Sequence, residues 1–213
     1  MQPRIRPVPG QPGQFVDVVT NQPFTLTSAY EGERYDTVRR ASGAITAGDS
    51  HSWFQSLTDK KRLDANFPAT GKLVTSSERM VLERIGFEIP LNTGTTVVQI
   101  DDVKRAVSSL YLKVTLNQTT IAEGPAIFFP SGYGLNGQTV ENASGIASIG
   151  VPSTAAAAKL VEPQIITDSH QIEAEGTYTS RSWISGYTLP TLDAALDFRL
   201  CMHGLLEKAA TNN

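Results

Sequence analysis

Three histidines and one cysteine are the side chains best suited to metal binding or nucleophilic chemistry in this sequence: His51, His170, His203 and Cys201. No two histidines are two or four positions apart in the sequence, although a close pair on one strand or helix is the usual nucleus of a metal site. We therefore expect each histidine at the surface or rim of the fold. A single cysteine excludes an intramolecular disulfide and a zinc site built from cysteines. Nothing in the sequence indicates a base or a helix N-terminus beside Cys201, so we expect no thiol nucleophile.

Two short motifs have the residue types of functional signatures but the wrong context. Gly132–Gly137 matches G-x-G-x-x-G, yet the dinucleotide fingerprint needs a strand that leads directly into a helix. Pro130 and Ser131 precede the glycines and no helical apolar period follows, which favours a glycine-rich turn. Gly48–Ser52 places Asp, Ser and His side by side, whereas catalytic triads converge from separate segments. The sequence therefore predicts no catalytic residue, no cofactor and no metal.

The charge pattern argues against direct nucleic-acid binding. The 213 residues carry 18 Lys+Arg and 21 Asp+Glu, for a net charge of −3. The one basic run is Lys60–Arg62, whereas phosphate binding needs several clustered cations. No apolar run approaches the roughly 18 residues of a membrane span. We expect neither a transmembrane helix nor a secretory signal peptide, because the first residues lead directly into Pro and Gly.

The first 78 residues have little regular pattern. Residues 1–14 hold four of the twelve prolines, and we interpret them as an extended arm that becomes ordered only against a neighbouring subunit. Residues 15–78 read as an irregular segment that docks on the main body or on neighbours. Within it we expect two short strands, Phe15–Val19 and Phe24–Thr27, and a short helix near Ser52–Arg62.

Residues 79–213 have the texture of a β-domain. Apolar side chains alternate with polar ones in four runs, which is the spacing of half-buried strands; these runs are 79–89, 110–116, 171–176 and 196–206. We also expect strands at 119–123, after a hairpin turn, and at 160–167. Asp101 and Asp102 predict the N-terminus of a short helix through Ser108. We expect Leu112, Val114, Phe198 and Leu200 in one β-core. Short strands with no strand–helix alternation predict an all-β, antiparallel sandwich or barrel.

Four features follow one another in this half. An aromatic–acidic–apolar strand at Arg84–Ile89 precedes a short polar helix and the strand Ser109–Leu116. The remaining features are Gly124-Pro125 with the turn Phe129–Gly134, then Gly150–Pro152 with Leu160–Ile165, and the terminal strand Leu196–Leu206. In pattern and order, residues 79–208 resemble the jelly-roll capsid proteins of tailless icosahedral bacteriophages, particularly those with an internal membrane. The resemblance implies a jelly-roll β-domain over residues 79–213.

The same resemblance implies a viral structural protein without enzymatic activity. The chain would be a capsid subunit that self-assembles into an icosahedral virion and passes through the host cytoplasm during assembly. Its partners would be copies of itself and other virion proteins, with a position near an internal viral membrane and no direct contact with nucleic acid. The alternatives are a tail, fibre or minor virion component, or a carbohydrate-binding or enzymatic jelly roll, which would need clustered aromatics or a His/carboxylate set.

Aromatic residues that fit no period are our candidates for self-association, because aromatic side chains are enriched at interface hot spots. They are Tyr30, Tyr35, Trp53, Phe54 and Trp183.

Overall fold

The computed structural model describes residues 5–12, 14–17, 23–25, 29–90, 98–130, 135–138, 146–149, 158–180 and 187–208. Its strands in chain order are β1 (Ile5–Pro7), β2 (Gln14–Asp17), β3 (Pro23–Thr25), β4 (Ala29–Arg40), β5 (Gly43–Ala44), β6 (Ser50–Trp53), β7 (Glu78–Glu88), β8 (Leu110–Leu116), β9 (Thr119–Pro125), β10 (Leu135–Gln138), β11 (Ile146–Ile149), β12 (Ala158–Ile166), β13 (Ile172–Tyr178), β14 (Thr191–Leu192) and β15 (Leu196–Lys208). The helices described are α1 (Ile100–Ser109) and the short 3-10 helix η1 (Ala126–Phe128).

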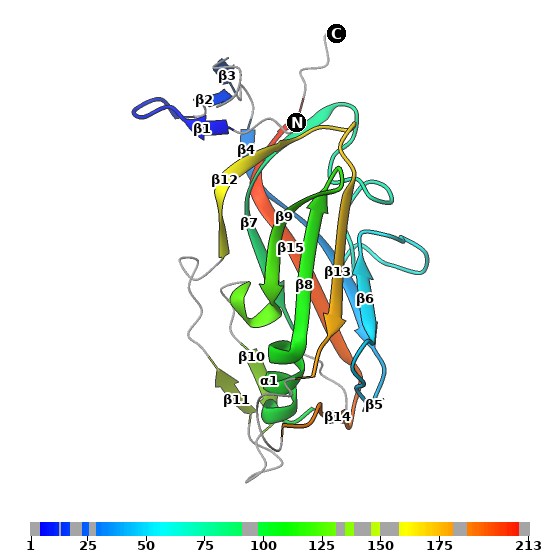
Figure 1. Ribbon diagram of the computed structural model, residues 1–213. Coiled ribbons are helices and arrows are strands. Elements are labelled where there is room, and N and C mark those ends of the chain that lie inside the picture. Colours follow the sequence, from blue (N-terminus) through cyan, green and yellow to red (C-terminus); the bar gives the residue numbers. More distant parts are fainter. Residues whose placement is uncertain are drawn as a thin grey trace.

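Two four-stranded sheets form the body of the molecule (Figure 1). The first sheet has the order β12-β7-β15-β4, and the second has the order β6-β13-β8-β9. Every neighbouring pair in both sheets is antiparallel. The expectation of an all-β antiparallel fold is therefore confirmed.

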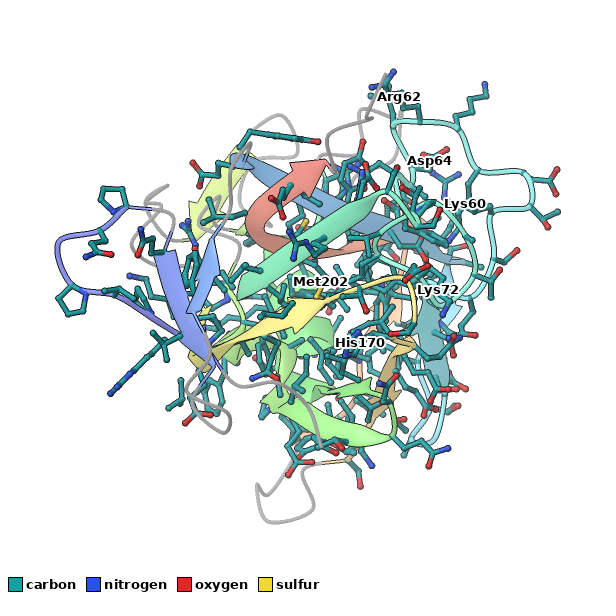
Figure 2. The ribbon with its side chains drawn as sticks, turned by 90° about the horizontal axis from the view of Figure 1, so that it is seen from above. Lys60, Arg62, Asp64, Lys72, His170 and Met202 are labelled. Carbon is teal, nitrogen blue, oxygen red and sulfur yellow. The ribbon has the colours of Figure 1, made fainter. Side chains whose placement is uncertain are left out.

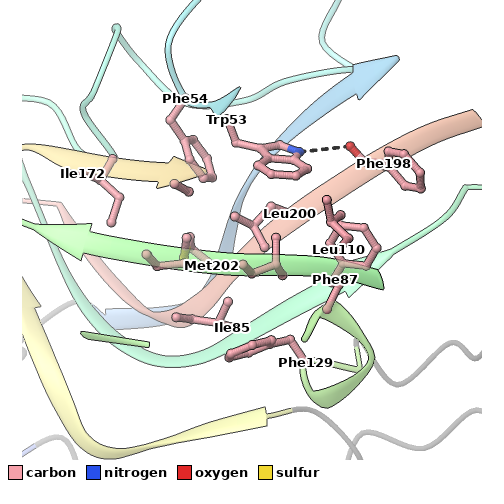
Figure 3. Packing of buried hydrophobic residues seen from close by; sticks show 14 of the residues in the cluster. Trp53, Phe54, Ile85, Phe87, Leu110, Phe129, Ile172, Phe198, Leu200 and Met202 are labelled. Carbon is pink, nitrogen blue, oxygen red and sulfur yellow. Dashed lines mark hydrogen bonds between the residues drawn. The ribbon is translucent and has the colours of Figure 1, made fainter. Parts of the chain in front are cut away.

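The core lies between the two sheets and is made by period-two alternation. In β8, Leu110, Leu112, Val114 and Leu116 are buried, while Tyr111 and Lys113 are exposed. Phe198 and Leu200 of β15 are fully buried in the same apolar cluster as Leu112 and Val114, as predicted (Figure 3). Asn117 and Gln118, both with positive φ, form the tight turn between β8 and β9, which is the backbone that a two-residue hairpin requires.

A β-bulge in β7 interrupts the strict alternation expected for residues 79–89. His203 of β15 is opposite Arg84, but the next residue, Gly204, is opposite Leu82, so Glu83 is an extra residue in β7. Strict alternation predicts that Val81 and Ile85 lie on the same face, but because of the bulge they lie on opposite faces. Val81 packs outside the main core, in a small cluster with Phe15 and Ile165. A bulge exchanges the two faces for all residues beyond it in the strand. The amino-acid sequence alone does not show where this bulge lies.

The N-terminal half is more regular than its sequence suggests. The expectation of an irregular segment over residues 15–78 is wrong for β4 and β6, because β4 is an edge strand of the first sheet and β6 an edge strand of the second. The helix expected near Ser52–Arg62 is also wrong, since β6 and a series of turns occupy that range. The pattern of β4 is hidden because its buried Asp36 accepts a hydrogen bond from the Phe54 backbone N–H at 2.6 Å and pairs with Lys60.

The proline-rich arm is not simply extended. β1 pairs with β2 and β2 with β3 in a small antiparallel sheet, and Phe15 of β2 is buried against Val81 and Ile165. The two expected strands after residue 14 are thereby confirmed over their described residues, 15–17 and 24–25. Residues 1–4 lie outside the described residues, and whether a neighbouring subunit orders the arm stays a prediction.

The connections between sheets gather at two ends of the sandwich (Figure 1). The end that carries α1 also carries β5, β10, β11 and β14. The helix itself confirms the expectation for residues 101–108, although Gln99, not an aspartate, is its N-cap. The opposite end carries the small N-terminal sheet and an excursion over residues 54–77. Among the described residues, no helix has the length and apolar character needed to cross a membrane.

Candidate functional site

Two of the expected self-association residues are core residues instead. Trp53 and Phe54 are both 0% exposed. Trp53 donates its indole Nε1–H to the Phe198 carbonyl at 3.1 Å (Figure 3), and the Phe54 ring stacks edge-on against Phe67 at 5.4 Å. The expectation that these two side chains face a partner is wrong, because β6 directs Trp53 between the sheets and the chain then turns Phe54 beneath the 54–77 excursion.

The two tyrosines of β4 differ from each other. Tyr30 is 47% exposed and remains available to a partner. Tyr35 is half-buried; its hydroxyl donates to the Arg62 carbonyl at 2.7 Å, and the Arg199 guanidinium lies 4.9 Å from its ring centroid. Tyr35 therefore already has partners within the chain. Trp183, the fifth candidate, lies outside the described residues.

The histidines are more enclosed than expected. His51 lies among the rings of Trp53, Tyr178 and Phe198, with ring centroids 5.5 to 6.1 Å away, and burial lowers its pKa. His170 accepts a hydrogen bond at Nδ1 from the Thr167 backbone N–H at 3.1 Å, and burial lowers its pKa as well. Both are half-buried, so each lies at the rim of the packed structure and is partly enclosed by its neighbours.

The third histidine, His203, belongs to a cluster of three side chains from two neighbouring strands. Glu33 of β4 is directly opposite His203 of β15, and Cys201 precedes His203 by two residues on the same face. One ligand atom from each of Glu33, Cys201 and His203 lies within 4.8 Å of the others. Because Leu200 and Met202 of β15 point into the core, this cluster lies on the outer face of the first sheet.

Burial sets the protonation of this cluster. Cys201 is 1% exposed, and burial, followed by the negative charge of Glu33, raises the pKa of its thiol well above the usual value. The thiol is therefore protonated at neutral pH and is not an activated nucleophile. Burial likewise lowers the pKa of His203, so its ring is neutral at neutral pH.

Two ion pairs flank the cluster along the strands. Arg199 donates to Glu88 at 2.9 Å, to the Thr37 hydroxyl at 3.1 Å and to the Leu63 carbonyl at 2.8 Å. On the other side, Arg84 pairs with Glu31 at 3.1 Å. These contacts tie β4, β7 and β15 together across the outer face of the first sheet.

Part of the 54–77 excursion closes the edge of this face. The backbone N–H of Thr37 donates to the Asp64 carbonyl at 2.9 Å, and that of Asn66 donates to the Tyr35 carbonyl at 3.1 Å. Figure 2 shows Lys60, Arg62 and Asp64 along this excursion. The basic run therefore has an internal role, because Lys60 pairs with the buried Asp36. Covering an edge strand in this way blocks unintended strand pairing.

Two of the three members of the cluster, Cys201 and His203, could be placed together from the sequence. The alternation of residues 196–206 predicts that Cys201 and His203 lie on one polar face of a strand. The third member was missed because the long strand β4 was not recognised, and without β4 no cross-strand partner could be assigned. The expectation of no metal site therefore did not take into account the pairing of β4 with β15, which places Glu33 opposite His203.

Two shallow depressions lie elsewhere on the described surface. One, of about 380 Å³, is on the outer face of the second sheet and is lined by Ser52, Gln55, Lys113, Thr115, Glu173, Ala174 and Glu175. The other, of about 300 Å³, lies between β9 and β12 and is lined by Thr119, Thr120, Ile121, Leu160, Val161, Glu162 and Gln164. Neither contains a histidine or a cysteine, so neither offers the metal-ligand set found on the first sheet.

No protein-family model, no curated protein and no solved structure matches this chain.

Proposed function

We propose that the eight strands of the two main sheets form a jelly roll. Numbered along the chain from one to eight, they are β4, β6, β7, β8, β9, β12, β13 and β15. The first pairs with the eighth, the second with the seventh, the third with the sixth and the fourth with the fifth. This is the pairing of a long antiparallel hairpin rolled on itself, which supports a jelly roll over other eight-stranded sandwiches.

On this fold we propose that the chain is a virion structural protein, a capsid subunit that assembles with copies of itself. The observation that carries the proposal is the strand pairing, because capsid proteins are among the main classes of double-sheet jelly roll. The resemblance of residues 79–208 to phage capsid proteins supports the same assignment. Lectins and cupins share this architecture, so the contents of the barrel and its outer faces bear on the choice between them.

The barrel interior favours a structural role. A cupin-type enzyme needs polar ligands inside the barrel, whereas the space between these sheets is filled by Trp53, Phe87, Phe198 and other apolar side chains (Figure 3). The cluster of Glu33, Cys201 and His203 lies on the outside of the first sheet, away from this interior. The packed core therefore supports a scaffold rather than an active-site barrel.

The exposed apolar side chains indicate where copies would meet. Phe128, the last residue of η1, is 69% exposed. Tyr111, 40% exposed, pairs with Pro125 at the end of β9. Leu63 is 79% exposed on the 54–77 excursion. We propose that Phe128 and Leu63, together with Tyr30, replace Trp53 and Phe54 as self-association residues, since large exposed apolar side chains favour interfaces.

Negative-stain imaging of the purified full chain tests this function. We expect closed particles or ring-shaped capsomers, because a permanent shell contact buries on the order of 2,000 Å² or more. Isolated fibres would instead support the tail or fibre alternative. Separate single subunits at every concentration would contradict a shell role.

A carbohydrate-binding module remains the second candidate because of the polar depression on the second sheet. Its Lys113, Glu173 and Glu175 could hydrogen-bond a sugar, and Tyr111 lies on the same face. Sugar-binding faces generally combine such groups with stacking aromatics. Trp53 and Tyr178 of these strands are buried on the core side, so Tyr111 is the one aromatic that points to the outer face among the described strand residues of this sheet. Binding of a glycan by the wild-type chain, lost in Tyr111→Ala, would favour this candidate over the shell.

A further inference from the structure

We propose that Glu33, Cys201 and His203 form a binding site for a divalent transition metal of the zinc class, which clamps β4 to β15 on the outer face of the first sheet. This proposal is independent of the function proposed above, because a metal clamp would stabilise the sheet in a capsid subunit and in a binding module alike.

The backbone already brings the three ligands together. Cys201 and His203 lie two residues apart on one strand, and Glu33 is the cross-strand partner of His203. Their ligand atoms are within 4.8 Å of one another, whereas tetrahedral ligands of zinc are about 3.3–3.7 Å apart when bond lengths are about 2.0–2.3 Å. Small side-chain rotations close that difference, and the strands that carry the ligands need not move.

An unpartnered atom points to a missing ligand. The Nε2 atom of His203 is buried and has no hydrogen-bond partner among the described residues. Buried polar atoms are nearly always satisfied, so an exception calls for an unseen group. A metal ion on Nε2 would satisfy this atom and also bind the buried sulfur of Cys201, whose side chain is almost fully enclosed.

The local charge suits a divalent cation. A Cys201 thiolate and the Glu33 carboxylate together carry two negative charges, which balance the metal when His203 is neutral. The two nearby arginines are already engaged, since Arg84 pairs with Glu31 and Arg199 with Glu88. Binding replaces the proton on the Cys201 sulfur with the metal, so one proton is released to solvent.

The ligand types select the metal. Sulfur, imidazole nitrogen and carboxylate oxygen suit Zn²⁺ and its analogue Co²⁺, whereas Ca²⁺ and Mg²⁺ prefer oxygen ligands alone. Three protein ligands leave the fourth tetrahedral position for a water molecule.

The test uses the full chain, purified without a polyhistidine tag and stripped with EDTA. Titration with Co²⁺ should produce a thiolate-to-cobalt charge-transfer band in the near ultraviolet at one equivalent. Elemental analysis should find one zinc per chain after zinc loading. Zn²⁺ at about 100 times its dissociation constant should raise the thermal midpoint by about 5–10 °C, while Mg²⁺ should leave it unchanged.

Single substitutions locate the site. Cys201→Ser should abolish the charge-transfer band. His203→Gln and Glu33→Gln should each weaken zinc binding by more than about 100-fold, since losing even a group that only hydrogen-bonds to a metal ligand costs about 10–100-fold. His170→Gln is the matched control, because it removes another half-buried histidine and should leave the affinity unchanged. Thermal midpoints measured in EDTA show that each variant still folds.

Two results would overturn the proposal. One is the absence of a charge-transfer band in the folded wild-type chain at excess Co²⁺, which would leave Cys201 as a thiol that hydrogen-bonds Glu33. The other is zinc binding that survives unchanged in both Cys201→Ser and Glu33→Gln, because the metal would then be held elsewhere.

Discussion

The outer faces of the two sheets arise from the same alternation of polar and apolar side chains. They differ in whether their polar side chains are held in a network of contacts. On the first sheet, Arg199 and Cys201 lie in a half-buried network tied to β4 and β7. On the second, Lys113, Glu173 and Glu175 are exposed, and no ion pair within 4 Å joins these three side chains in the part of the chain that the structure describes. Period-two spacing therefore identifies an outer face, but only the surrounding segments decide whether its polar groups become an organised cluster.

The segment that makes this difference is the 54–77 excursion. It contributes the Leu63 carbonyl to Arg199, the Arg62 carbonyl to Tyr35 and backbone hydrogen bonds to the edge of β4. The polar face of the second sheet gains no such cover in the described structure. We therefore expect substitutions on the first sheet to cost more than matched substitutions on the second.

The largest contrast should come from two glycines. An added Cβ at Gly204, beside the bulge of the first sheet, would lie 1.8 Å from the Val81 carbonyl oxygen, whereas at Gly176 of the second sheet it would meet the Trp53 ring at 3.0 Å. A backbone atom cannot yield as a side chain can. Gly204→Ala should cost more than about 4 kcal/mol or prevent folding, and Gly176→Ala about 1–3 kcal/mol. Urea denaturation measures both, and equal costs would refute the close approach at the bulge.

Trp53→Ala should be the next most damaging change. It empties a fully buried site between the sheets and removes the hydrogen bond to Phe198, so we expect a loss of about 3–5 kcal/mol in the free energy of unfolding. Trp53→Phe is the conservative control and should lose less. Unfolding is measured at a concentration where subunits are separate. If the stability of the separate subunits were unchanged, Trp53 would not be a core residue, and the interface role expected from the sequence would be favoured.

A third pair compares the charged residues of the two faces. Arg199→Ala removes the partner of Glu88 and three further contacts, and should cost about 2–3 kcal/mol because a half-buried carboxylate is left unpaired. Lys113→Ala, on the exposed face, should change stability by less than about 0.5 kcal/mol. Chemical denaturation of both variants gives the comparison, which fails if the two costs are alike.

A fourth effect is a pH dependence of the free energy of unfolding. Burial lowers the pKa of His51 and of His203, so below the unfolded pKa of about 6.5 the unfolded chain binds protons that the folded chain does not. Stability should therefore fall as the pH drops from 7 towards 5, by up to about 1.4 kcal/mol per pH unit for each histidine. His51→Gln should reduce the slope. A slope that is flat in the wild type, or unaltered in the variant, would contradict the burial of the His51 ring.

The fold could be predicted where side chains alternate cleanly, as the match between β8, β13 and their expected strands illustrates. It could not be predicted in β4, because the buried Asp36 and half-buried Arg34 are satisfied by partners 18 to 44 residues away in the chain. The candidate site depends on that same strand. Cys201 and His203 could be placed on one face from their spacing, whereas Glu33 required the register of β4 against β15, which depends on long-range pairing.

The jelly-roll shell assignment is tested most directly by sedimentation velocity of the full chain at micromolar concentrations, with Phe128→Ser as the variant. We expect the wild type to sediment as large assemblies that grow with concentration. Because Phe128 is mostly exposed, the variant should shift towards the monomer while its thermal midpoint stays within a few degrees of the wild type. A single monomeric boundary for the wild type at every concentration would contradict the shell assignment.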